Sequence, residues 1–300
     1  MYFVYFVVLS IFYTGNVSKD DFSDAALVLL GHGSTANAES GAAVCQQAAE
    51  LRRRKWFAEV REAFWKQEPQ VMRVLSALTA RRVFVVPMFI SEGYFSEGVI
   101  PRELGFGSRP MEMGEGFSRV QQRGDQRLFY CRPVGTHEGM TAVLLARARE
   151  ILERFPFPRA PKPKETTLFI AGHGTERNEN SRRAVERQVE LIRSLHLYAE
   201  VYAVFLEEEP RIGDCYRIAA TKNLIIVPFF ISNGLHAQED IPVMLGEPER
   251  VVQKRLKAGQ AIWRNPTERN GKLVWYSSGV GAEPEVADVI LERVREAVRW

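Results

Sequence analysis

The segment LIIVPFFISNGLHAQEDIPVML, from Leu224 to Leu245, joins an apolar run to a polar stretch that carries one histidine, His236. A near-copy, VFVVPMFISEGYFSEGVIPREL, runs from Val83 to Leu104 and has Phe95 at the position of that histidine. An apolar run that ends at a proline and is followed by an Asn-Gly or Glu-Gly turn signal is typical of a buried strand leading into a loop. The chain therefore carries the same strand-and-loop unit twice, and only one copy has the imidazole.

Two further blocks repeat at the same offset of 141 residues. LVLLGHGSTANAES (27–40) matches LFIAGHGTERNENS (168–181), and AEVREAFWKQEP (58–69) matches AEVYAVFLEEEP (199–210). A period this long indicates a duplicated domain and not a solenoid repeat. The seam RFPFPRAPKPKE (154–165) carries four prolines and is typical of a stiff linker. The predicted organisation is an extension (1–24), a first half (25–155), a Pro-rich linker (156–166) and a second half (167–300).

Within each half, short aliphatic runs alternate with helical patterns. In the second half the runs are TLFIAG, AEVYAVFL, NLIIVPFF and KLVWYSS, and between them Val185, Val189 and Ile192 recur at helical spacing. A further helical segment is expected from Pro210, and an amphipathic helix closes the chain. Alternating strands and helices with near-continuous apolar strands predict a parallel sheet covered on both faces. We therefore expect two tandem, doubly wound α/β domains, each with a four-stranded parallel sheet.

Composition narrows the class of protein. The chain has 300 residues, 46% of them hydrophobic and 26% charged, with a net charge of +3, which favours neither nucleic acid nor an anionic membrane as a partner. The three cysteines are widely spaced and form no CxxC pair, so reduced thiols in the cytoplasm are expected. The apolar residues 1–13 are too short to span a bilayer. They fit an extension or mis-assigned start, a packed strand or helix, or a signal or anchor.

Several ionisable residues follow predicted strands, where ligands of a doubly wound sheet bind. The first strand of the second half leads into Gly172-His173-Gly174, and the third leads to His236 and, four residues later, Asp240. The second strand ends at the acidic residues 207–209, of which we expect two to be solvated turn residues. We therefore expect two imidazoles and at least one carboxylate at one edge of the sheet.

This set of residues suits two kinds of chemistry. Two histidines and a carboxylate can hold a borderline divalent metal such as Co(II), Ni(II), Fe(II) or Zn(II), and imidazoles also accept protons near neutral pH. The chain has no GxxxxGK[ST] phosphate loop, no GxGxxG after a strand and no GxSxG nucleophile elbow. Nucleotide-dependent chemistry and serine hydrolysis therefore lack their usual signatures.

Three segments together resemble a known family. The strand followed by GHG[ST], the block VPFFISNGLHAQEDIP and the segment CRPVGTHEGM are similar to class II tetrapyrrole chelatases, and above all to CbiX-type sirohydrochlorin cobaltochelatases in their two-half form. The similarity extends from about residue 25 to the end of the chain, once in each half. The pattern PFF[IL]SxGxHxxxDIP is specific, whereas GHG alone is not.

The resemblance implies an ATP-independent lyase of tetrapyrrole and cobalamin biosynthesis. A sirohydrochlorin-like macrocycle would lie in a cleft between the halves, and Co(II), or alternatively Fe(II) or Ni(II), would be the substrate metal. His173 and His236 would bind the metal and accept the pyrrole protons, with Glu207 assisting. No nucleotide cofactor is implied, and the protein would be a monomer or homodimer. A carrier that binds metal or tetrapyrrole without turnover, or a metal-dependent hydrolase, remains the alternative class.

The resemblance also assigns the residues expected to contact the macrocycle. These residues are Gly172 and Gly174 on either side of His173, Arg177 just after them, and Ser232 and Gly234 before His236. Secondary candidates for the metal or the protons are His32, Asp240 and Glu209. Arginines near the predicted edge that could pair with the macrocycle's carboxylates are Arg102, Arg109, Arg177 and Arg182.

The two halves are not equivalent in sequence. His32 matches His173, but Phe95 stands opposite His236, Val99 opposite Asp240 and Lys66 opposite Glu207. The first half therefore cannot supply the same ligands, and the complete site is expected in the second half alone. Some two-half members of the family carry the pair in the first half, and this chain departs from that arrangement. The remaining histidines, His137 and His196, are expected at a helix start and a helix end.

Overall fold

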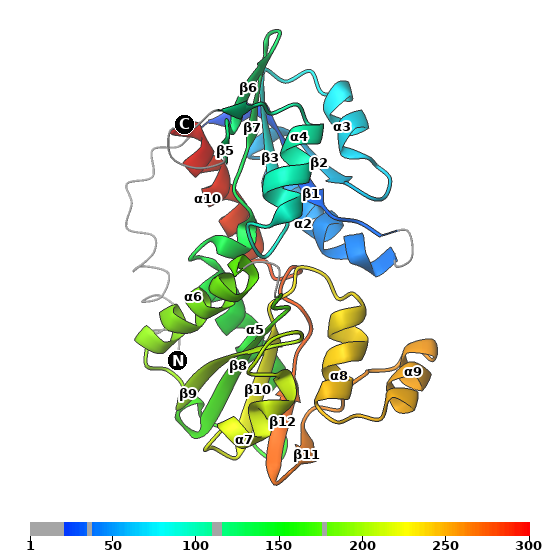
Figure 1. Cartoon of the computed structure of the whole chain (residues 1–300), viewed down its shortest axis with the longest axis vertical. Helices are drawn as coiled ribbons and strands as arrows, with labels where there is room; N and C mark the ends of the chain where they lie inside the picture. The colour runs from blue at the N-terminus through cyan, green and yellow to red at the C-terminus, as the bar shows by residue number, and fades with distance from the viewer. Residues whose placement is uncertain (1–20, 35–37, 110–115, 176–178) are drawn as a thin grey trace. The chain divides into compact units, whose positions relative to one another are not determined.

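The computed structural model describes residues 21–34, 38–109, 116–175 and 179–300, which form two compact units (Figure 1). Of the described residues, unit 1 contains 21–142 together with Pro284–Trp300, and unit 2 contains Val143–Glu283. The final helix of each sequence repeat therefore belongs to the unit built from the other repeat. The expectation for residues 1–13 lies outside the described residues. Over the described part of the chain, every helix is too short or too polar to cross a membrane.

Unit 1 is built on a five-stranded sheet in the order β2-β1-β3-β7-β6, in which the first four strands are parallel and β6 is antiparallel to β7. Its strands are β1 (Phe22–Gly31), β2 (Phe57–Phe64), β3 (Arg82–Pro87), β6 (Val120–Arg123) and β7 (Gln126–Tyr130), beside a small ribbon of β4 (Ser108–Arg109) and β5 (Gly116–Phe117). Its helical segments are η1 (Ala38–Gly41), α2 (Ala42–Arg54), α3 (Val71–Ala77), η2 (Tyr94–Val99), α4 (Ile100–Glu103), η3 (Val134–Thr136), the start of α5 (Met140–Arg154) and α10 (Val286–Val298).

Unit 2 repeats this architecture with the strand order β11-β12-β10-β8-β9, where β11 is the antiparallel edge. Its strands are β8 (Thr166–Gly172), β9 (Glu200–Phe205), β10 (Asn223–Pro228), β11 (Thr267–Arg269) and β12 (Lys272–Tyr276). Its helical segments are the rest of α5, η4 (Pro163–Glu165), α6 (Asn180–Ser194), η5 (Ile212–Asp214), α7 (Cys215–Ile218), η6 (His236–Asp240), α8 (Ile241–Met244) and α9 (Glu249–Lys257).

The prediction of two tandem, doubly wound α/β domains is confirmed, and each sheet has one antiparallel strand more than expected. All seven residues of the central strand β8 are buried, so apolar side chains point to both faces of the sheet. Helices must therefore pack on both faces. The helical segment expected from Pro210 begins two residues later than predicted, at Ile212. Pro210 itself lies in a bend, where its carbonyl accepts from the N–H of Phe205.

In each unit, a helix that belongs to the other sequence repeat packs beside the sheet. In unit 1, α10 packs against α2 and β3, and Arg293 on α10 donates to the carbonyl of Pro133, at 3.0 Å, in the segment that follows β7. In unit 2, Arg147 on α5 donates to the carbonyl of Gly279, at 3.2 Å, in the segment that follows β12. Both arginine side chains are buried. These contacts fix the segments at the carboxyl ends of the sheets, where the candidate site lies.

Candidate functional site

Three neighbouring strands of unit 2 deliver the candidate residues to one edge of the sheet. His173 follows β8, Glu207 follows β9, and His236 lies in the segment after β10. Because parallel strands end at the same edge of a sheet, these residues converge. Backbone hydrogen bonds hold the segment after β9 against the segment after β8, since the N–H groups of Leu206 and Glu207 both donate to the carbonyl of His173 at 3.1 Å. The sequence-based placement of the three residues at this edge agrees with their position in the structure.

The two imidazoles face each other. The ring centroids of His173 and His236 are 4.9 Å apart and the rings are nearly perpendicular, at 88°. Their side chains are 37% and 49% exposed, so a solvent-borne ligand can reach both. The pair is preformed and open, as a site that takes up and releases its ligand requires.

Hydrogen bonds at Nδ1 set the tautomer of both imidazoles. Nδ1 of His173 lies 2.6 Å from the carbonyl oxygen of Gly174, and Nδ1 of His236 lies 2.6 Å from Oδ2 of Asp240. A carbonyl and a carboxylate can only accept, so each Nδ1 carries the hydrogen in the neutral ring. Each Nε2 then has an unprotonated lone pair, which is available to a metal ion or a proton. Asp240, expected from the sequence only as a secondary candidate for the metal or the protons, therefore orients His236.

His236 was expected in a loop, but the structure places it in a helix. His236 begins the π-helix η6 (His236–Asp240), whose i to i+5 bonding is seen in the N–H of Ile241 donating to the carbonyl of His236. Nothing in the sequence distinguishes this bonding pattern from a loop or an α-helical turn. The π-helix places the side chains of His236 and Asp240 side by side, because both lie on the same short helical segment.

The three adjacent glutamates have three different partners. Oε2 of Glu207 lies 3.8 Å from Nδ1 of His173, and this side chain is 55% exposed. Glu208 accepts from the N–H of Thr175 and from Arg182 at 2.6 Å, while Glu209 faces Arg211 at 3.7 Å. Only Glu207 is thus directed at an imidazole, as expected for one of the three. Glu209 is solvated as expected and belongs to a surface ion pair. Glu208 is only 14% exposed because it pairs with Arg182 and holds the turn after His173, so the expectation of a solvated residue is wrong for Glu208.

A pocket of about 360 Å³ opens beside His236. Its lining contains four acidic residues, one amide and four apolar side chains. The acidic residues are Glu207, Glu239, Asp240 and Glu249, the amide is Gln253, and the apolar residues are Leu206, Val243, Met244 and Val252. Among the described residues, no three His, Cys, Asp or Glu side chains converge in a ready-made metal site. Two imidazoles with one nearby carboxylate form an incomplete coordination set, which leaves positions open for other ligands of a metal ion.

The glycines of the first turn have local structural reasons. A Cβ on Gly172 would lie 2.4 Å from Cγ2 of Val185 in α6, and Gly174 has φ +67°, which favours glycine. Ser232 and Gly234 lie half-buried between β10 and η6. Their expected contacts with a macrocycle therefore stay a prediction.

The candidate arginines have different positions. Arg182 is held by Glu186 at 3.0 Å and by Glu208, so it serves the local structure. Arg102 is exposed on α4, and Arg109 lies in β4. Arg177 lies outside the described residues.

Unit 1 keeps the scaffold of this site with different chemistry. Nδ1 of His32 lies 2.9 Å from the carbonyl of Gly33, and the ring of Phe95 stands 5.3 Å from the His32 ring at 81°. Lys66 occupies the position of Glu207, with its N–H donating to the carbonyl of His32 at 2.8 Å, and its ammonium lies over the ring of Trp65. Val99, at the position of Asp240, is buried. An aromatic ring and a cation thus replace the second imidazole and the carboxylate.

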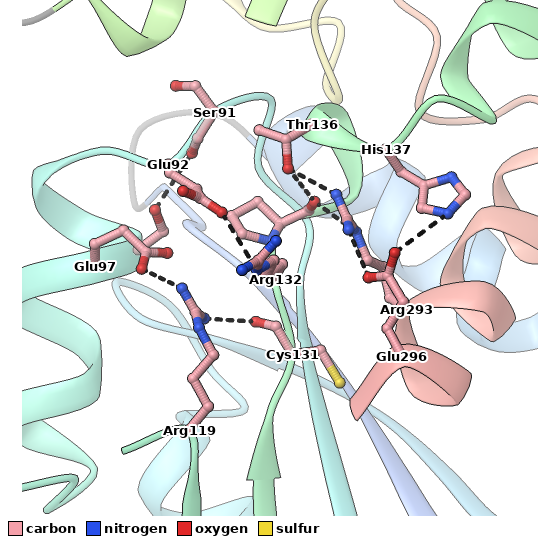
Figure 2. Close-up of polar contacts among 12 residues, drawn as sticks. Ser91, Glu92, Glu97, Arg119, Cys131, Arg132, Thr136, His137, Arg293 and Glu296 are labelled. Carbon is pink, nitrogen blue, oxygen red and sulfur yellow. Dashed lines mark hydrogen bonds and ion pairs between the residues drawn. The ribbon is translucent and has the colours of Figure 1, made fainter. Parts of the chain in front are cut away.

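Figure 2 shows the polar contacts at this edge of unit 1, where ion pairs link the segment after β3 to Arg119, just before β6, and to Arg132, just after β7. Arg119 pairs with Glu97 of η2, and Arg132 lies 3.9 Å from Glu92. Burial raises the pKa of Glu97 to about 7 in spite of Arg119. None of these residues was singled out from the sequence, because single charged residues give no signal without the fold.

The two remaining histidines lie where the sequence predicts. Nδ1 of His137 accepts from the N–H of Gly139 at 2.9 Å at the start of α5, which confirms a helix-start role. Its Nε2 lies 3.7 Å from Glu296, and burial lowers its pKa (Figure 2). His196 follows the end of α6 with φ +50° and accepts a bond from Lys164 through its carbonyl.

Comparison with known proteins agrees with the duplicated α/β fold, which places the chain in the class of two-domain chelatase folds. The family model CbiX matches twice, over residues 26–151 and 167–297. The chain belongs to the CbiX family.

A Halobacterium salinarum protein named "Probable sirohydrochlorin cobaltochelatase" is 40% identical over 279 residues, which cover 91% of each chain. A multi-domain protein from Deinococcus radiodurans, described as structurally similar to chelatases, superposes with a TM-score of 0.70 at 30% identity over 90% of this chain. This chain covers 54% of that protein, about half its length. The fold is also that of the sirohydrochlorin chelatase SirB from Bacillus subtilis in complex with cobalt, with a TM-score of 0.58, 17% identity, and coverage of 92% and 95%.

Proposed function

We propose that this protein inserts a divalent metal, Co(II), into a sirohydrochlorin-type tetrapyrrole without a nucleotide. The observation that carries the proposal is the facing pair of imidazoles, 4.9 Å apart, at the carboxyl edge of the unit 2 sheet. The names of the Halobacterium relative and of SirB supply the substrate class. The protein would be a lyase of tetrapyrrole and cobalamin biosynthesis.

The chemistry follows from charge balance. A divalent cation that enters the macrocycle replaces two pyrrole hydrogens, so two protons leave for each metal inserted. The unprotonated Nε2 atoms of His173 and His236 can accept them, since imidazole is a base near neutral pH. Glu207, whose Oε2 lies 3.8 Å from Nδ1 of His173, then stabilises the imidazolium until the proton on Nε2 is released to water. The two imidazoles therefore provide one base for each of the two protons released.

The same site must hold the metal weakly. Imidazole and carboxylate donors suit borderline divalent cations, and an incomplete set leaves positions for water and then for the macrocycle nitrogens. These donors bind Co(II), Fe(II) and Ni(II) in the same way, so cobalt is proposed from the relatives' names. Fe(II) and Ni(II) are the alternatives to be tested.

The turns that flank the imidazoles are the proposed contacts of the macrocycle. They contain Gly172, Gly174, Ser232 and Gly234, and Arg177 is a sequence-based candidate for pairing with a carboxylate. The protein is proposed to act in the reducing cytoplasm as a monomer or homodimer, in keeping with free thiols at Cys45, Cys131 and Cys215.

The test is an anaerobic assay of sirohydrochlorin with Co(II), Fe(II) or Ni(II), followed by the absorbance of the macrocycle. The wild type is expected to exceed the spontaneous rate, fastest with Co(II), and His236→Ala to fall to that rate. His32→Ala is the matched control, since it removes the equivalent imidazole of the other half. A wild type that gives only the spontaneous rate with all three metals would exclude the chelatase. Stoichiometric macrocycle binding without turnover would instead identify a carrier.

A further inference from the structure

The π-helix that carries His236 has a gap in its hydrogen bonding. The N–H of Ile241 donates to the carbonyl of His236, in the i to i+5 pattern. The next bond of this pattern would join the carbonyl of Ala237 to the N–H of residue 242, which is a proline and has none. Ala237 is buried, at 3% exposed, so its carbonyl needs a donor from elsewhere in the fold.

The side chain of Tyr276 supplies that donor. Its hydroxyl donates to the carbonyl of Ala237 at 2.5 Å, from the last residue of β12. The side chain is 4% exposed and belongs to the hydrophobic core of unit 2. Burial raises the pKa of Tyr276 well above its usual value, so the hydroxyl remains a donor. A rigid strand of the sheet is thus tied to the residue next to His236.

Unit 1 repeats the device at the equivalent positions. Tyr130, the last residue of β7, donates to the carbonyl of Ser96 in η2 at 2.8 Å, and the residue five positions after Ser96 is Pro101. Tyr130 is fully buried. The same proline, the same orphan carbonyl and the same tyrosine therefore occur in both halves, but only in unit 2 does the tied turn carry an imidazole.

We infer that Tyr276 is a positioning residue: its hydroxyl replaces the N–H that Pro242 lacks and so fixes the first turn of η6, which sets the distance between the imidazoles of His236 and His173. The inference rests on the proposed function for its effect on turnover, whereas its effect on metal binding does not need the macrocycle. Without the hydroxyl, the turn shifts to find another donor and the imidazole pair is no longer held at its separation.

The experiment compares Tyr276→Phe with Tyr130→Phe, which removes the same hydroxyl from the other half. Two quantities are measured: chelatase turnover, and the affinity of the metal-free protein for Co(II) followed by its visible absorption without macrocycle. Tyr276→Phe is expected to lower both kcat and Co(II) affinity by about 10- to 100-fold, with KM for the macrocycle unchanged. Tyr130→Phe should leave both unchanged, although each variant loses thermal stability to a similar extent.

A second variant tests the physical cause. Pro242→Ala in the Tyr276→Phe background restores a backbone N–H at position 242, and part of the lost Co(II) affinity should return. The inference is overturned if Tyr276→Phe keeps wild-type Co(II) affinity, or if Tyr130→Phe loses as much as Tyr276→Phe. If His236→Ala also keeps Co(II) affinity, the proposed metal site itself fails, which is a different result.

Discussion

The edges of the two sheets share one scaffold and differ in chemistry. In unit 2, His173 and His236 face each other at 4.9 Å and 88°, and in unit 1, His32 and Phe95 take up the same arrangement at 5.3 Å and 81°. The first ring of each pair is bonded through Nδ1 to the carbonyl of the following glycine. The ring arrangement therefore follows from the fold, and the presence of a second imidazole follows from the identity of one side chain.

The substituted edge of unit 1 is also unsuited to a cation by charge. The ammonium of Lys66 lies 4.8 Å from the centroid of Trp65 and 5.9 Å from that of Phe95, in cation–π contacts. A fixed positive charge repels an incoming divalent ion, whereas Glu207 at the same position of unit 2 attracts one. The two halves thus keep the same packing at this edge, while only unit 2 has the second imidazole and the carboxylate.

The largest expected effect comes from removing one imidazole of the pair. His173→Ala or His236→Ala should lower kcat by about 10²- to 10⁴-fold, the usual contribution of a positioned acid or base. His32→Ala should leave kcat close to that of the wild type, because its ring faces Phe95. Steady-state rates with sirohydrochlorin and Co(II) measure this difference. Equal losses in all three variants would mean that both halves take part.

The adjacent glutamates provide a sharper version of the comparison. Glu207→Gln should reduce kcat by about tenfold, because the imidazolium at His173 loses its neighbouring charge. Glu208→Gln should mainly lower thermal stability, since Glu208 holds Arg182 and the N–H of Thr175. Turnover and thermal unfolding are measured on both variants. The assignment fails if Glu208→Gln has the greater effect on kcat.

The lost site can also be rebuilt. Phe95→His together with Lys66→Glu gives unit 1 the two imidazoles and a carboxylate on a scaffold that already sets their spacing. We expect one additional, weaker Co(II) site per chain, weaker because Val99 supplies no carboxylate to orient the new ring. Equilibrium dialysis counts the sites, with Phe95→Ala and Lys66→Glu as the control. No additional site would show that the scaffold alone does not set the geometry.

The smallest effect concerns stability and pH. The pKa of Glu97 is raised from 4.5 to about 7 by burial, so between these values the folded state keeps a proton that the unfolded chain has released. Stability present below pH 4.5 is therefore lost as the pH rises through about 7. Glu97→Gln should flatten this part of the pH profile of thermal unfolding. The equivalent residue of unit 2 is already a glutamine, Gln238, and Gln238→Ala serves as the control.

The sequence predicts most of the fold because duplication makes each pattern visible twice. The parallel strands and the convergence of His173, Glu207 and His236 follow from periodicity and from the edge at which parallel strands end. The antiparallel strands β6 and β11 were not predicted, since they are short and only partly buried edges.

Three features of the site depend on tertiary geometry that the sequence does not express. The π-helix bonding of η6, the division of the glutamates between different partners, and the tie from Tyr276 to Ala237 all arise from three-dimensional contacts. The hydrogen bond from Tyr276 to Ala237 does have one signature in the sequence. A tyrosine occurs at the end of the last parallel strand in both halves, in LFYCR and in VWYSS, and each half has a proline five residues after the carbonyl it binds.

The central claim is that each chain has one metal site, in unit 2. The most direct measurement is a titration of the metal-free wild type, His236→Ala and His32→Ala with Co(II) in the absence of macrocycle. We expect one site in the wild type, its loss in His236→Ala and its retention in His32→Ala. Two equivalent sites in the wild type, or a single site that disappears in His32→Ala and persists in His236→Ala, would contradict the claim.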